Sequence, residues 1–216
     1  MPRYRLTFSK SGYVRFTSHL DMIRLFERAF RRAGIELEFS QGFNPHPKMV
    51  FAQPLPLGYS AEEEIVEIDT AEEYDLKDLL ARTDAEMPDG IVIKTVRETE
   101  KKKKTVAADC FAADYRIEIE SSSPDKLADA ASELIAADHF VVTKKTKRGE
   151  RDMDIRPMIR SLDYSIQDNK IILSTKLDTG SRSNLSPQQV TEAISRLSKS
   201  EIPPENIEIS RLKLYV

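Results

Sequence analysis

The sequence predicts an α+β protein built from two tandem ferredoxin-like domains, each with the element order βαββαβ and an antiparallel sheet. Three observations support this prediction. Stretches of helical period alternate with short β-rich runs, this alternation occurs twice, and a run of lysines, Lys101–Lys104, separates the two occurrences. The length of 216 residues is enough for two domains of about 100 residues each. We therefore expect domains at residues 1–100 and 106–216.

The first half contains two expected helices among β-rich runs. Ser18 followed by Asp21 has the form of a capping box, so a helix is expected to begin there and to run to Ala33. Gly34 can then adopt the left-handed conformation that commonly ends helices. A second helix is expected at 74–83. The β-rich runs, the first two of which meet at Gly12, predict strands at 3–8, 13–17, 35–39, 49–54, 63–69 and 90–98.

The second half repeats this order with one insertion. Ser123-Pro124 and Ser186-Pro187 each place a capping residue before a proline, which is favoured in the first helical turn. Helices are therefore expected from these positions to about Ala137 and Ser198. A short additional helix is expected from Ile155 to Leu162. The β-rich runs predict strands at 114–120, 139–145, 170–177 and 206–215.

Composition and motifs narrow the function classes. The single cysteine, Cys110, excludes an intramolecular disulfide and fits a reducing compartment. Apolar runs are too short to span a bilayer and the N-terminus lacks a signal-peptide stretch, so we expect a cytoplasmic protein without a membrane role. Phosphate-binding loops, dinucleotide fingerprints, zinc-protease motifs and paired cysteines are absent from the sequence, and its three histidines lie far apart. We expect neither a metal nor a cofactor.

Charge is unevenly distributed along the chain, although the net charge is only −3. Residues 1–58 carry nine lysines and arginines against four acidic residues, whereas residues 59–100 carry four against fourteen. A basic segment beside an acidic one indicates either an anion-binding surface or two surfaces that neutralise each other.

The first expected helix is amphipathic, with apolar residues on one broad face. The opposite face carries four arginines: Arg24, Arg28, Arg31 and Arg32. Guanidinium groups suit phosphate because their planar donors can bind two oxygens at once. The stripe can also be simply solvated, or it can pair with the acidic segment 62–75. These three interpretations stay open.

His19 lies at the start of this helix, where backbone N–H groups favour anions. It is a candidate phosphate contact or proton donor, and it can equally be an ordinary surface residue. Ser18 is better explained as a cap than as a nucleophile.

The segment SQGFNPHPKM, residues 40–49, connects two expected strands. Its two prolines restrict their own backbone and that of the residues before them, so the loop is expected to be stiff. A stiff loop loses little entropy when its side chains bind a ligand. The polar side chains that it presents are those of Gln41, Asn44, His46 and Lys48. A rigid connector whose prolines protect a sheet edge is the alternative, and composition does not decide between the two.

Residues 14–58, VRFTSHLDMIRLFERAFRRAGIELEFSQGFNPHPKMVFAQPLPLG, resemble the signature block of a bacterial radical-SAM-linked domain family of unknown function. The likeness continues weakly through DIRPMIRSL (154–162) and the Ser-Pro helix start near 186. The residues that match the family's motif are Arg15, Ser18, His19, Asp21, Arg24, Arg28, Arg31, Arg32, Gln41, Gly42, Asn44, Pro45, His46 and Pro47.

This resemblance implies a partner and a process but no catalytic residue. In that family the domain occurs alone or fused behind a B12-binding-type radical SAM enzyme, and its genes neighbour those of a ribonuclease and of ribosomal proteins. A radical SAM enzyme and RNA are therefore the implied partners. The chain lacks the cysteine triad of an iron–sulfur cluster, which implies a free-standing accessory form. The fold order is also similar to that of the CRISPR-repeat endoribonucleases, but TGSRSN (179–184) is a poor substitute for their glycine-rich loop.

Three functions follow as hypotheses. The first, which we favour, is a non-catalytic RNA-binding or substrate-presenting accessory module for a radical SAM enzyme. Its nucleic-acid or anion contacts would be Arg15, His19, Arg24, Arg28, Arg31, Arg32, Gln41, Asn44, His46 and Lys48. The second is a metal-independent nuclease or transferase that uses His19 and His46 as an acid–base pair. The third is a protein-interaction adaptor that does not bind nucleic acid.

Overall fold

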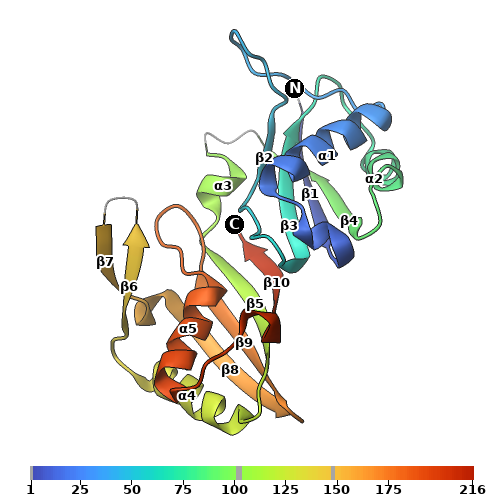
Figure 1. The fold of residues 1–216 in the computed structure, drawn as a ribbon. Helices are drawn as coiled ribbons and strands as arrows, with labels where there is room; N and C mark the ends of the chain where they lie inside the picture. The colour runs from blue at the N-terminus through green and yellow to red at the C-terminus, as the bar shows by residue number, and fades with distance from the viewer. Residues whose placement is uncertain (1, 101–103, 147–148) are drawn as a thin grey trace. The chain divides into compact units, whose positions relative to one another are not determined.

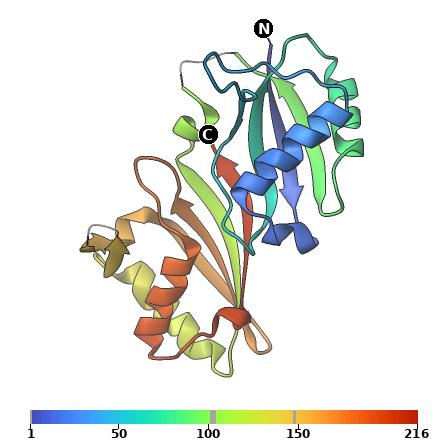
Figure 2. The same cartoon turned by 45° about the horizontal axis from the view of Figure 1, so that its top comes forward.

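The structure is a computed structural model that describes residues 2–100, 104–146 and 149–216. The chain is a mixed α+β protein whose strand pairs are mostly antiparallel, as the sequence predicts in outline (Figures 1 and 2). It divides into two compact units, one comprising Met1–Cys110 with Lys213–Val216, and the other comprising Phe111–Leu212. Most of the expected linker, Lys101–Lys104, lies outside the described residues.

The first unit arranges three strands in the order β4-β1-β3, and β2 also pairs with β3. The strands are β1 (Arg3–Lys10), β2 (Met49–Phe51), β3 (Ser60–Asp69) and β4 (Ile91–Glu98). The pairs β1–β3, β1–β4 and β2–β3 are antiparallel. Helices α1 (His19–Arg32) and α2 (Leu76–Ala85) lie on one face of these strands, and the short helix α3 (Val106–Asp109) follows β4 (Figures 1 and 2).

The core of this unit lies between the sheet and the two helices. Phe26 of α1 is fully buried, and its ring centroid lies 4.8 Å from that of Phe8 and 5.3 Å from that of Phe51. Val66 and Ile68 of β3 belong to the same apolar cluster. Because successive strand side chains point to opposite faces, the residues that alternate with them, Glu67 and Asp69, lie on the other face of the sheet.

The second unit arranges its strands in the order β10-β5-β9-β8. The strands are β5 (Ala112–Glu120), β8 (Ile159–Gln167), β9 (Lys170–Asp178) and β10 (Ile207–Tyr215). Helix α4 (Pro124–Ala136) packs against α5 (Pro187–Ser198) and against β8 and β9 (Figure 1). Strands β6 (Val141–Thr146) and β7 (Gly149–Asp154) form a separate two-stranded sheet. Within the described residues, no helix has the length and hydropathy needed to cross a membrane.

The strand predicted at 13–17 is wrong. Residues Gly12–Phe16 form a 3₁₀ helix, which begins at Gly12 with a φ of +60°. The physical reason is long-range, because both edges of β1 are already paired with β3 and β4, and the run after Gly12 cannot add to β1 as a hairpin. The strand expected at 35–39 is reduced to two isolated bridges, Leu37 with Thr70 and Phe39 with Pro47.

The helix predicted from Ile155 to Leu162 is also wrong. A 3₁₀ turn at Arg156–Met158 leads directly into β8. Ile159 and Leu162 are both buried, and their three-residue spacing imitates a helical period. The spacing arises instead from an irregularity between Ile159 and Ser161 in the pairing of β8 with β9, because a bulge changes the alternation of side chains.

Candidate nucleic-acid interface

Ser18 caps helix α1 as the sequence predicts, but the full capping box does not form, because the Asp21 side chain bonds to the Ser18 hydroxyl instead of the Ser18 backbone N–H. The Ser18 hydroxyl accepts a hydrogen bond from the Asp21 backbone N–H at 3.3 Å and donates one to Asp21 Oδ2 at 2.7 Å. The bond from Ser18 lowers the pKa of the Asp21 carboxyl, and the neighbouring Arg24 adds to this effect. Gly34 follows the helix at a φ of +66°, as expected for a left-handed helix stop. The helix is therefore fixed at both ends.

The four arginines of α1 divide into two paired and two unpaired side chains. Arg24 pairs with Asp21 at 3.1 Å, and Nε of Arg32 lies 2.6 Å from Glu86 Oε2. Neither pair uses the acidic segment 62–75, which was one of the open interpretations. Arg28 and Arg31 are exposed, and neither has an ion-pair partner among the residues that the structure describes. These two guanidinium groups are available to a ligand.

A pocket of about 490 Å³ lies beside this face of α1. Arg28 and Arg32 line it together with the apolar side chains of Leu25, Met87 and Pro88. The lining also holds two carboxylates: Glu86 pairs with Arg32, and Asp21 pairs with Arg24 and interacts electrostatically with Arg28. Arg28 is thus the cation of this lining that has no ion pair of its own among the described residues. The pocket combines a cation with apolar surface, which suits a phosphate and the sugar attached to it.

His19 lies in a different and much smaller pocket of the same unit. Its ring packs edge-on to Phe51 with the centroids 5.6 Å apart. The pocket measures about 20 Å³, and its lining includes Lys10 and Glu64, which are both buried. Lys10 Nζ donates to the carbonyl of Thr17 at 3.0 Å. A space of this size holds about one water molecule, so it cannot receive a large ligand. The position of His19 is therefore explained by packing against Phe51.

The loop between α1 and β2 extends away from the helices and carries its own internal bonds (Figure 1). The Ser40 N–H donates to the His46 carbonyl at 2.9 Å, and the His46 N–H donates to Ser40 Oγ at 3.1 Å. His46 Nδ1 lies 3.0 Å from the Asn44 carbonyl oxygen. Residues 41–46 are exposed, and Phe43 is fully so. These bonds support the expected stiffness and leave the tip open to a partner.

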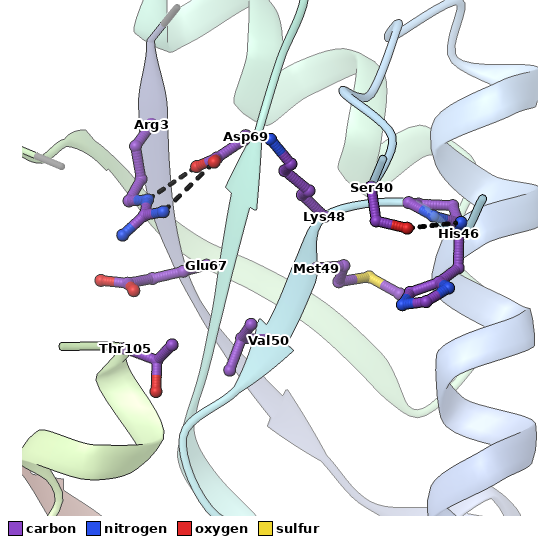
Figure 3. A pocket seen from close by; sticks show the side chains of 10 residues that line it. Arg3, Ser40, His46, Lys48, Met49, Val50, Glu67, Asp69 and Thr105 are labelled. Atoms are coloured by element: carbon purple, nitrogen blue, oxygen red, sulfur yellow. Dashed lines mark hydrogen bonds and ion pairs between the residues drawn. The ribbon is translucent and has the colours of Figure 1, made fainter. Parts of the chain in front are cut away.

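The base of this loop forms one side of a pocket of about 290 Å³ (Figure 3). Ser40 and His46 lie on the loop side, while Arg3, Glu67 and Thr105 lie across from them in this view. Three ion pairs surround it, and their shortest N–O distances are 2.6 Å for Arg3–Asp69, 2.7 Å for Arg5–Glu67 and 2.6 Å for Lys48–Glu38. The hydrogen bond with Asp69 raises the pKa of Arg3. The pocket is therefore polar and electrically compensated.

The structure groups the predicted residues into separate places rather than one cleft. His46 and Lys48 line the pocket of Figure 3, His19 lines the small pocket, and Arg28 and Arg32 line the pocket beside α1. Arg15 lies in the 3₁₀ helix with its guanidinium 4.9 Å from the ring centroid of Phe16. The described residues include no group of three or more His, Cys, Asp and Glu side chains that could hold a metal ion.

Sequence reasoning missed several residues at these places. Arg3, Glu67 and Asp69 line the pocket of Figure 3, and Phe43 and Tyr13 are among the most exposed aromatic side chains. The alternation of charged with apolar residues in β1 and β3 was a usable signal for the ion pairs, since one face of a sheet collects every second residue.

The sequence profile of the family described as "Uncharacterized protein conserved in bacteria (DUF2344)" matches residues 3–187. The chain belongs to the DUF2344 family. All ten predicted contact residues lie inside the part that matches DUF2344, as do all the residues that line the pockets beside the loop and beside α1. No curated protein matches the chain.

Comparison with solved structures finds a related fold for this DUF2344 member but little shared sequence. A chain in "Crystal Structure of a Cbf5-Nop10-Gar1 Complex" is similar with a TM-score of 0.54 and 10% identity, over 98% of this chain and 48% of that chain. The DUF2344 chain thus spans about half the length of that relative. An unknown protein from Galdieria sulphuraria, aligned over 100% of this chain and 99% of its own, has 12% identity and a TM-score of only 0.29. The first likeness shows a related fold and nothing about activity.

Proposed function

We propose that this chain is a non-catalytic RNA-binding module that presents single-stranded RNA to a radical SAM enzyme in the cytoplasm. The observation that carries the proposal is the exposed face of α1, where Arg28 and Arg31 lack an ion-pair partner among the described residues. Two guanidinium groups three residues apart lie on one side of a helix and can contact neighbouring phosphates. Phosphate contacts of this kind position RNA without reading its sequence.

Exposed aromatic side chains in the same unit favour single-stranded RNA over a duplex. Tyr13, Phe16 and Phe43 are exposed, and Phe43 stands at the tip of a loop held by internal hydrogen bonds. Unstacked bases bind such rings by stacking, whereas the bases of a duplex are already stacked on each other. The nuclease hypothesis has less support, because His19 and His46 line different pockets.

The strand order supports a tandem ferredoxin-like architecture for this module. In the order β4-β1-β3, where β2 also pairs with β3, and in the order β10-β5-β9-β8, the first strand of each half lies between the fourth and the third. We infer two βαββαβ halves, in which the β6–β7 hairpin is an insertion between α4 and β8. The radical SAM partner rests on the resemblance of residues 14–58 alone.

A charge-reversal experiment tests RNA binding. Fluorescence anisotropy with a single-stranded RNA of about 12 nucleotides compares the wild type with the double variant Arg28→Glu/Arg31→Glu. We expect an affinity loss of about tenfold or more, since two phosphate contacts are replaced by repulsion. The matched control, Arg116→Glu/Lys126→Glu, reverses two exposed cations of the second unit and should bind as the wild type does. Equal affinity in both variants would contradict the proposal.

A separate pull-down tests the radical SAM partner. Recovery of that enzyme with the tagged chain, before and after nuclease treatment, separates an RNA-bridged association from a direct one. Direct association together with no RNA affinity would favour the adaptor hypothesis instead.

A further inference from the structure

The pocket beside the loop has the features of a site for an uncharged, planar polar group (Figure 3). We propose that it receives one unstacked base of the RNA bound by this chain, an inference that rests on the proposed function. The pocket shares Ser40 and His46 with the exposed loop, so a strand that contacts the loop passes close to its opening. RNA-binding proteins commonly read such splayed bases.

Charge balance argues against a phosphate in this pocket. Its described lining contains two cations, Arg3 and Lys48, and two carboxylates, Glu67 and Asp69. Asp69 is paired with Arg3, Glu67 with Arg5, and Lys48 with Glu38, so no positive charge of this described lining is left uncompensated. The carboxylates are also only 6% and 4% exposed. Buried ion pairs contribute little net stability, so folding alone does not explain their position beside a cavity. A role in binding does explain it.

Among the described residues of the pocket, one donor is unused and one carboxylate oxygen accepts a single hydrogen bond, which leaves it capacity for another. Glu67 Oε1 accepts from Nε and Nη2 of Arg5, while the one hydrogen bond to Glu67 Oε2 among the described residues comes from the Val106 N–H at 3.2 Å. Arg3 uses Nε and Nη2 for Asp69, and its Nη1 has no hydrogen-bond partner in the part of the chain that is described. The edge of a base offers complementary acceptors and donors.

Size and wall chemistry fit one base. The volume of about 290 Å³ lies at the lower end of ligand pockets, which span roughly 300–1,000 Å³. Pro47, Met49 and Val50 supply apolar surface for the faces of a ring. The pocket therefore offers apolar contact to a base's faces and hydrogen bonds to its edge, and it cannot admit a duplex.

Two RNAs that differ only in their bases test the inference. Fluorescence anisotropy measures the affinity for a single-stranded RNA of about 12 nucleotides and for the same backbone with abasic sites throughout. The decisive quantity is the ratio of the two affinities in each protein, because stacking on Phe43 also contributes to it. Val50→Trp fills the pocket, and Arg3→Lys keeps the charge but removes the free Nη1 donor. Val92→Trp adds the same bulk at an exposed position of β4 outside the pocket.

We expect the ratio of the two affinities to fall on the order of tenfold in Val50→Trp, because one base is lost from its site. The ratio should also fall in Arg3→Lys. Val92→Trp should keep the wild-type ratio. Circular dichroism checks folding, and Arg3→Lys decides the matter if Val50→Trp does not fold. If the wild type binds both RNAs equally, the base pocket is contradicted but RNA binding is not. An unchanged ratio in Arg3→Lys has the same consequence. Failure of the wild type to bind either RNA overturns the proposed function as well.

Discussion

At the scale of single residues, the exposure of a side chain decides what it can do. Phe43 is fully exposed, whereas Phe26 and Phe30 on the nearby helix are fully buried. Nothing local distinguishes these phenylalanines except helical spacing, which assigns the latter two to the core. The functional interpretation of Phe43 therefore needs the structure, because only the loop's geometry shows that no other described element of the first unit covers it.

The contact between His139 and Asp154 predicts a pH-dependent contribution to stability. Nδ1 of His139 lies 2.6 Å from Asp154 Oδ2, and this hydrogen bond raises the pKa of His139 above its ordinary value of 6.5. When the pKa of a group is higher in the folded state than in the unfolded state, its contribution to stability is complete below the unfolded pKa. The contribution is lost as pH rises through the folded pKa. As pH rises from about 6 to about 9, we therefore expect the free energy of unfolding to fall less in His139→Gln than in the wild type.

Urea midpoints across this pH range provide the measurement for His139. The control, His46→Gln, removes an imidazole elsewhere but keeps the pair of His139 with Asp154, and should show the wild-type decline. The same hydrogen bond lowers the pKa of Asp154, so its contribution is present above the ordinary value of 3.8 and is lost as pH falls through the depressed value. An identical decline in wild type and His139→Gln would refute the assignment.

At the scale of elements, the caps of α1 and α5 were predictable, whereas the cap expected at Ser123 makes no side-chain bond and the strand partners were not predictable. Ser18 and Ser186 both accept a backbone hydrogen bond, and Ser186 with Gln189 forms a complete capping box. Such caps depend on residues within one turn. The segment 13–17 depends instead on which strands occupy both sides of β1, and the segment 155–162 on a bulge against β9. Local patterns contain neither fact.

Ser18 and Ser123 each precede a helix, and the structure predicts different effects on stability when each is replaced by alanine. Ser18 bonds to the Asp21 backbone, while Ser123 precedes α4 without a side-chain capping bond. Ser18→Ala should therefore lower the free energy of unfolding by about 0.5–2 kcal/mol. Ser123→Ala should change it by less than about 0.5 kcal/mol. Urea unfolding of both full-length variants, followed by circular dichroism, measures the difference, and equal losses would show that the Ser18 bonds are not stabilising.

At the scale of the whole molecule, the site could be predicted in part. The basic face of α1 and the stiffness of the loop follow from spacing and proline content. The pocket of Figure 3 does not, because it joins β1, β3, the loop and Thr105, which are distant in sequence and meet only through strand register. For the same reason the sequence could not divide the four arginines of α1 into paired and unpaired ones, since the partner of Arg32 is Glu86.

The net charge of −3 limits how this chain can bind RNA. An acidic protein attracts a polyanion only through a local basic surface, so few phosphates should be neutralised on binding. Each phosphate contact to a single strand contributes about −0.7 to the slope of log affinity against log salt. The two arginines without an ion pair among the described residues, Arg28 and Arg31, should together contribute about −1.4 to the slope between about 50 and about 200 mM salt.

Arg28→Gln/Arg31→Gln should flatten this slope by about 1.4, because two contacts are removed without added repulsion. Anisotropy titrations at several salt concentrations give the slopes directly. Arg116→Gln/Lys126→Gln makes the same change in net charge at exposed positions of the second unit, and should leave the slope unaltered. If both double variants flattened the slope equally, RNA would be responding to the overall charge of the molecule, and the face of α1 would lose its assignment as the phosphate-binding surface.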